Sequence, residues 1–148
     1  MSMLDTNLET IEHVVRIDAT RETVWTFWTD PARLCEWWGV EAEAVAEPGG
    51  VFRVVMDSGA PVMRGEYVEL DPPDRLVFTF GWEGNDPGEP LAPGSTRVEV
   101  TLEADADATV LTLRHELPAT HAADHAKGWA HFLDNQMTAC ATQVSGEV

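Results

Sequence analysis

Hydrophobic and polar residues alternate near the start of the chain, in residues 9–18 (ETIEHVVRID). One face of this segment carries Ile11, His13, Val15 and Ile17, and the positions between them are mostly charged. Side chains of a β-strand point to its two faces in turn. The period of two therefore predicts a strand with one covered side.

Two short helices are predicted next. In residues 21–29 (RETVWTFWT) the apolar positions recur at spacings of three and four, and Thr20 can cap the helix that this spacing predicts. Asp30 followed by Pro31 starts a second helix, because aspartate caps helix N-termini and proline suits the first helical position. We expect Gly39 to end it.

Six more strands are predicted between residues 40 and 117, because alternating segments are separated there by turn-forming residues. They cover residues 40–47, 51–57, 62–70, 75–82, 96–104 and 109–117. In the segment RLVFTFGW, one face carries Leu76, Phe78, Phe80 and Trp82, and the other carries Arg75, Val77, Thr79 and Gly81. Residues 83–95 are an acidic loop rich in glycine and proline.

The spacing changes again over residues 120–144, which predicts one long helix. Its apolar stripe consists of Trp129, Phe132, Leu133, Met137, Cys140 and Val144. Consecutive strands with short turns form an antiparallel meander, and this helix is the only element able to cover its apolar face. The expected fold is α+β, with an antiparallel curved sheet wrapped around a long C-terminal helix in the order β-α-α-β6-α. We expect one domain over residues 9–145, preceded by a flexible tail of residues 1–8.

The adjacent tryptophans Trp37 and Trp38 close the second short helix. Successive side chains of a helix point about 100° apart, so the two rings cannot face the same neighbour. We expect Trp37 to pack beneath the short helices and Trp38 to face the space between the sheet and the final helix.

The composition limits the expected binding partners and the expected cellular compartment. Twenty-six acidic residues oppose nine basic ones, for a net charge of −17. Such a surface repels phosphate backbones and anionic lipids, so no nucleic acid or membrane partner is expected, and solubility is the simpler reason for the charge. With two cysteines, no signal sequence and no long apolar run, we expect a soluble, cytoplasmic protein without a disulfide.

Four segments carry a resemblance to a known family: TDPARLCEWWG, PGGVFRVVM, GEYVELDPPDRLVFTF and KGWAHFLDNQ. Together they resemble the START-like helix-grip superfamily, also called SRPBCC, over roughly residues 9–142. Within it they look most like homologues of the activator of the ninety-kilodalton heat-shock ATPase. The resemblance implies the helix-grip fold but no single function, because this fold carries lipid binders, hormone receptors, polyketide cyclases and co-chaperone domains.

The candidate ligand site is a cavity between the sheet and the final helix. Its expected lining consists of Trp28, Trp38, Met56, Phe78, Phe80, Trp82, His115, Trp129 and Leu133. Aromatic and methionine side chains suit a flat or lipid-like apolar molecule. Packing of the core without a ligand accounts for the same residues and stays open as the alternative.

Three histidines are candidates for chemistry. His115 points inward by alternation, so its imidazole needs a hydrogen-bond partner, which could be a ligand, Tyr67, a backbone carbonyl or water. His121 and His125 are four residues apart on the final helix, a spacing that can offer two metal ligands. The sequence gives them no third ligand with a glutamate, so we expect both to face solvent and predict no metal and no cofactor.

Three functions follow from these residues. The first is non-catalytic binding of a small hydrophobic or amphipathic ligand in the cavity. The second is an enzyme of the polyketide cyclase or hydrolase type, with His115 and Tyr67 as acid–base residues. The third is a co-chaperone that stimulates a bacterial heat-shock ATPase. The outer sheet face looks solvated, which favours a monomer or a weak homodimer.

Overall fold

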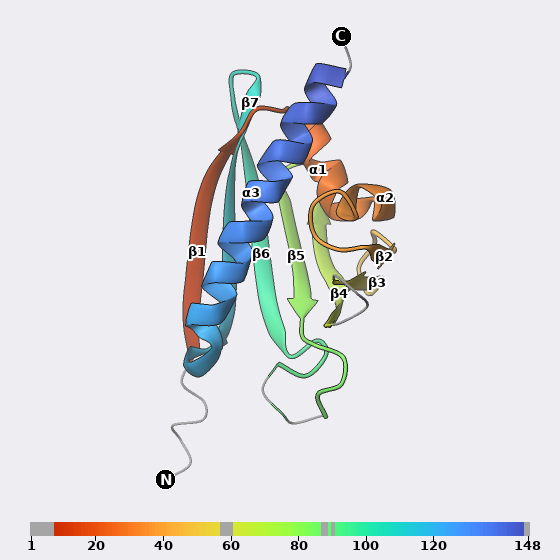
Figure 1. Cartoon of the computed structure of the whole chain (residues 1–148), viewed down its shortest axis with the longest axis vertical. Helices are drawn as coiled ribbons and strands as arrows, with labels where there is room; N and C mark the ends of the chain where they lie inside the picture. The colour runs from red at the N-terminus through yellow and green to blue at the C-terminus, as the bar shows by residue number, and fades with distance from the viewer. Residues whose placement is uncertain (1–7, 57–60, 87–88, 90, 147–148) are drawn as a thin grey trace.

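The computed structural model describes the backbone of residues 8–56, 61–86, 89 and 91–146, with side chains up to residue 140. The elements follow the order β1 (Leu8–Ile17), α1 (Arg21–Thr29), α2 (Pro31–Leu34), β2 (Glu41–Ala44), β3 (Val51–Val55), β4 (Val62–Asp71), β5 (Arg75–Phe80), β6 (Thr96–Asp105), β7 (Ala108–Pro118), the 3₁₀ turn η3 (Ala119–His121) and α3 (Ala122–Gly146) (Figure 1). Residues 1–7 of the expected tail, most of the turn at 58–61 and the side chain of Val144 lie outside the described residues.

All seven strands form one antiparallel sheet in the order β1-β7-β6-β5-β4-β3-β2. Each strand from β2 to β7 pairs with its neighbours in sequence, as a meander does, and β1 closes the order beside β7 with Ile11 opposite His115. The predicted α+β helix-grip fold, with its order of strand, two helices, six strands and helix, is confirmed.

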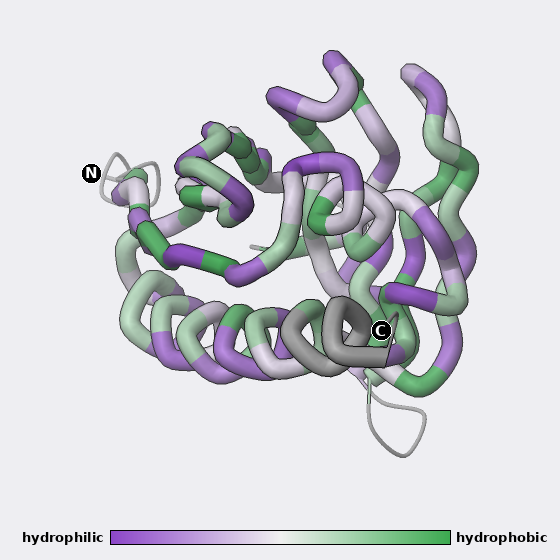
Figure 2. The backbone as a smooth tube through the Cα atoms, turned by 90° about the horizontal axis from the view of Figure 1, so that it is seen from above, coloured by the Kyte–Doolittle hydropathy of each residue, from purple (hydrophilic) through white to green (hydrophobic). Residues whose placement is uncertain are grey.

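The long helix α3 covers one face of the sheet. Figure 1 shows α3 lying across the strands. The view from above places it on one side of the sheet, with hydrophobic and hydrophilic residues alternating along it (Figure 2). Its buried side chains are Ala122, Trp129, Leu133, Gln136 and Cys140, and Phe132 and Met137 are partly buried against the core. The described part of the apolar stripe predicted for this helix therefore packs on the core. Among the described residues, no helix combines the length and the apolar character needed to cross a membrane.

The short helices begin as predicted, but α2 ends earlier. The Thr20 hydroxyl accepts from the Thr23 amide at 3.3 Å, and the Asp30 carboxylate accepts from the Ala32 amide at 3.1 Å. Helix α2 stops at Leu34, whereas Gly39 was expected to end it, and a turn follows over residues 35–38.

This early end changes how the two tryptophans lie. Trp37 and Trp38 stack on each other with ring centroids 5.1 Å apart, and both contact Trp28, at 4.8 Å and 6.2 Å. The expectation that they could not share a neighbour is wrong, because the 100° step between side chains applies to a helix and not to a turn. Trp37 does pack beneath the short helices, since its indole N–H donates to the Phe27 carbonyl at 2.8 Å.

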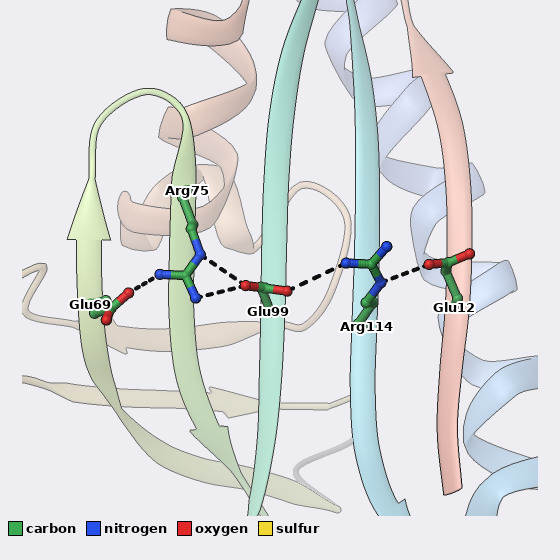
Figure 3. Close-up of polar contacts among 5 residues, drawn as sticks. All are labelled: Glu12, Glu69, Arg75, Glu99 and Arg114. Carbon is green, nitrogen blue, oxygen red and sulfur yellow. Dashed lines mark hydrogen bonds and ion pairs between the residues drawn. The ribbon is translucent and has the colours of Figure 1, made fainter.

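The outer face of the sheet carries a ladder of ion pairs across five strands. Arg75 binds Glu69 and Glu99, and Arg114 binds Glu99 and Glu12 (Figure 3). Exposed pairs of this kind contribute about 0–1 kcal/mol each, so the ladder covers this face more than it stabilises the fold. Val77 lies on this face and is nevertheless fully buried, because Glu69 and Glu99 lie opposite it in register and pair with Arg75.

Candidate functional site

An aromatic pocket of about 240 Å³ lies between the end of β5 and the first turns of α3. Its lining consists of Trp38, Phe80, Trp82, Asp124, His125, Gly128, Trp129 and Phe132. Two other depressions, one beside the β6–β7 hairpin and one on the outer sheet face, are lined mainly by polar and charged residues. Binding sites for small molecules are concave and mostly apolar, so the aromatic pocket is the candidate site.

The pocket walls are ring systems that brace one another. The rings of Trp38 and Phe80 lie 13° from parallel at 6.4 Å, and Trp38 also contacts Trp129 at 5.2 Å. Trp82 meets Phe80 edge to face at 5.2 Å. Aromatic pairs in these arrangements hold each other's orientation. The walls are therefore preformed.

Behind the pocket wall lies His115, fully buried on β7. The Trp129 indole can only donate, so His115 Nδ1 accepts its hydrogen bond at 3.0 Å. The Thr96 hydroxyl donates its one proton to the Phe80 carbonyl and lies 2.8 Å from His115 Nε2, so that nitrogen carries the hydrogen and donates to Thr96. Both ring nitrogens are occupied, and His115 is the neutral Nε2–H tautomer.

The surroundings of His115 keep it neutral over a wide pH range. Burial, with the nearby His125, lowers the pKa of His115 from 6.5 to about 3. Desolvation disfavours the charged imidazolium, and a second proton on Nδ1 would break the hydrogen bond from Trp129. His115 therefore has no lone pair or exchangeable proton free for a ligand at neutral pH.

A second indole–imidazole pair lies at the pocket itself. The Trp82 indole donates to His125 Nε2 at 3.1 Å, and His125 Nδ1 lies 2.8 Å from the His121 carbonyl, to which it can only donate. His125 is thus the neutral Nδ1–H tautomer, with both nitrogens in use. The partner of its Nε2, Trp82, follows β5 and forms an isolated bridge with Met63 of β4, so this bond joins the sheet to α3.

Tyr67 lies in another part of the core. Its hydroxyl donates to the Trp28 carbonyl at 2.9 Å, its ring stacks on Phe52 at 4.7 Å, and burial raises its pKa. Among the hydrogen bonds of the described residues, none joins Tyr67 to His115. Tyr67 and His115 belong to separate hydrogen-bond networks, one with Trp28 and the other with Thr96 and Trp129.

A comparison with protein-family models matches residues 18–142 to the Activator of Hsp90 ATPase homolog 1-like proteins, the AHSA1 family. The match covers most of the chain and includes every lining residue of the pocket. The chain belongs to this family. The resemblance stated from the sequence is confirmed, and the AHSA1 family lies within the START-like SRPBCC superfamily.

Solved AHSA1-like structures agree with this fold. An AHSA1-like protein from Rhizobium etli is 33% identical, with 90% of this chain and 83% of that chain covered and a TM-score of 0.69. DynU16, from the dynemicin biosynthetic locus, is 27% identical with a TM-score of 0.73. That match covers 87% of this chain but 46% of DynU16, so the chain spans about half the length of that relative.

A third structure bears on assembly. The Aha1 protein from Colwellia psychrerythraea, solved as a dimer, has a TM-score of 0.73 and 21% identity over 89% of this chain and 96% of its own. A homologue therefore forms a dimer. At this level of identity, the comparison supports only a shared fold for the present chain. A comparison with curated proteins found no match.

The candidate residues of this AHSA1-like protein divide into two groups. Trp38, Phe80, Trp82 and Trp129 line the pocket. The remainder are buried in the core outside that lining: Trp28, Met56, Phe78, His115 and Leu133. The expected cavity is thus confined to one end of the helix–sheet interface.

Sequence reasoning missed the helical side of the pocket. Asp124, Gly128 and Phe132 are four residues apart, so they share one edge of α3 beside Trp129. Gly128 could have indicated this side of the pocket from the sequence. A glycine inside a helix lowers its stability by about 1 kcal/mol relative to alanine, so its presence there suggests a functional or packing role.

The expectation for His125 needs correction. It was expected to face solvent with His121, but it is half-buried and bonded to Trp82. Within the described part of the chain, no group of three or more His, Cys, Asp or Glu side chains is placed to hold a metal ion. With both of its nitrogens in use, His125 contributes a polar but uncharged patch to the pocket wall.

Proposed function

We propose that this AHSA1-like protein binds a small apolar or amphipathic molecule in the aromatic pocket and catalyses no reaction on it. The observation that carries the proposal is the pocket itself, about 240 Å³ with five aromatic side chains in its lining. Sites for drug-sized ligands usually measure about 300–1,000 Å³. This one suits a small molecule or one end of a larger one.

Gly128 supports a ligand rather than simple packing. Apart from its chain neighbours and the backbone of its own helix, a Cβ atom added at Gly128 would meet no heavy atom within 4 Å, so the position opens onto empty space. A glycine inside a helix lowers stability, and nothing in the packing requires it here. The glycine keeps this space free for a ligand, which offsets the loss of helix stability.

The hydrogen bonds of three candidate acid–base residues support binding over turnover. His115 and His125 use both ring nitrogens in hydrogen bonds, and the Tyr67 hydroxyl donates to a backbone carbonyl. General acid–base catalysis needs a group that can exchange a proton with the substrate. These residues are committed to holding the pocket walls in place.

One relative is consistent with a small-molecule ligand. DynU16 is attributed to the dynemicin biosynthetic locus, and it is 27% identical to this chain.

The family name favours a second candidate function, stimulation of a heat-shock ATPase. The test is the ATPase rate of a bacterial ninety-kilodalton heat-shock protein, measured with and without this chain. Among the described residues, the exposed large apolar side chains are spread over the sheet, with Leu8 and Val14 on β1, Val40 and Val45 beside β2, and Val68 on β4.

The pocket can be tested with a neutral probe, 3-tert-butylphenol, followed through the six tryptophan indole N–H signals in ¹H–¹⁵N NMR spectra. We expect saturable shifts for Trp38, Trp82 and Trp129. Native mass spectrometry of the purified protein should also detect a co-purified small molecule.

Two variants of α3 locate the binding. Gly128→Leu places a side chain in the pocket and should abolish the indole shifts. Ala130→Leu adds the same bulk at an exposed position of the same helix and should leave them unchanged. Shifts that persist in Gly128→Leu, or a wild-type protein that shows none, would contradict the proposal.

A further inference from the structure

We infer that the pocket selects a ligand with a positively charged organic group, such as a quaternary or protonated amine, on an apolar body. The inference rests on the proposed binding function and adds the charge of the ligand to it. Three observations carry it: the aromatic walls, Asp124 as the one carboxylate of the described lining, and the two hydrogen bonds of His125.

The walls present ring systems to the space between them. Trp38, Trp82 and Trp129 are indoles, and Phe80 and Phe132 complete the lining. Ring faces carry negative partial charge, and indole attracts cations more strongly than the rings of tyrosine or phenylalanine. Several aromatic side chains around one space are the arrangement that recognises quaternary ammonium groups.

The charge at the pocket has one sign. Among the described lining residues Asp124 is the one ionised side chain, and no lysine or arginine joins it. Asp124 lies in the first turn of α3 and is exposed, so it marks the side of the pocket that meets solvent. A cation held between the rings would have this carboxylate at the entrance, and an anion would be repelled.

His125 adds no opposing charge. Its Nδ1–H donates to the His121 carbonyl and its Nε2 accepts from Trp82, so the hydrogen bonds fit the neutral ring. A protonated His125 would point an N–H at the indole N–H of Trp82. The net charge of −17 acts in the same direction, by drawing cations toward the protein.

Three phenols of nearly the same shape test the inference: (3-hydroxyphenyl)trimethylammonium, 3-tert-butylphenol and 3-hydroxybenzenesulfonate. They differ in the charge of one group, which is positive, neutral or negative. We expect the cation to bind about tenfold tighter than the neutral compound in NMR titrations, and the sulfonate to bind most weakly. Gly128→Leu should abolish binding of the cation, which separates pocket binding from general attraction to an acidic protein.

Asp124→Asn isolates the carboxylate. We expect this variant to bind the cation about threefold more weakly and the neutral phenol with unchanged affinity. Asp134→Asn, at an exposed position farther along α3, should change neither affinity. Equal affinity for the cation and the neutral phenol would overturn the inference and leave the proposed function standing. Failure of every probe to shift the pocket indoles would overturn both.

Discussion

The indole N–H of Trp129 donates a hydrogen bond to Nδ1 of His115 at 3.0 Å. One partner lies on the pocket-forming helix α3 and the other on β7 beneath it. With Thr96 accepting from Nε2, the bond fixes the protonation state of a fully buried imidazole. The histidine thus serves as a neutral connector between the helix and the sheet.

The tautomer can be observed directly. In long-range ¹H–¹⁵N NMR spectra, His115 should show a protonated Nε2 and an unprotonated Nδ1 at pH 7. Because burial lowers its pKa to about 3, these signals should stay constant down to about pH 4, whereas a histidine in water titrates near pH 6.5. A midpoint between pH 6 and 7 for His115 would contradict the hydrogen-bond assignment.

The same depressed pKa makes stability depend on pH. Between about pH 6.5 and pH 3 the unfolded chain holds a proton on His115 that the folded chain does not, so stability falls as pH falls through this window. At up to about 1.4 kcal/mol per pH unit, the contribution lost between pH 7 and pH 5 is about 2 kcal/mol.

Urea denaturation at the two pH values measures this loss. Other titrating groups contribute as well, so the comparison is with His115→Gln, in which the difference between pH 7 and pH 5 should be smaller by about 2 kcal/mol. An equal difference in the two proteins would show that His115 titrates alike in the folded and unfolded states.

The fold was predictable because each strand buries one face. Alternation assigned the inner face of β5 correctly, and the capping signals of Thr20 and Asp30 located both short helices. The position of α3 along the sheet was not predictable from the pattern. Phe78 and Phe80 share one face, yet Phe80 lines the pocket and Phe78 lies in the core, a difference that depends on where the helix rests.

Contacts between distant segments account for the rest of the site. The bond from Trp82 to His125 spans 43 residues of sequence, and helical spacing alone paired His125 with His121 instead. The orientation of Trp37 and Trp38 depended on the end of α2 at Leu34, and boundaries of short helices are set by local tertiary contacts that periodicity does not report.

Thr96→Val tests the polar connection beneath the pocket. Valine has nearly the shape of threonine but cannot donate to the Phe80 carbonyl or accept from His115 Nε2. Leaving buried partners unsatisfied costs about 1–3 kcal/mol, and we expect a loss of that size in urea denaturation at pH 7. Thr101→Val, on the same strand and outside this network, should cost less than the Thr96 variant.

Gly128→Ala separates the needs of the helix from those of the pocket. A methyl group at Gly128 meets no atom of another element within 4 Å, so the variant should gain about 0.5–1 kcal/mol from helix propensity and lose affinity for 3-tert-butylphenol. Gly65→Ala is the opposite case, because its Cβ would lie 1.8 Å from the Thr79 carbonyl oxygen of the next strand, and it should be destabilised by more than 1 kcal/mol. Urea denaturation and the NMR titration, run on both variants, give the two readouts. If the Gly128→Ala protein is less stable than the wild type, the glycine serves the packing of α3. Its presence in the helix would then not be evidence for an open pocket.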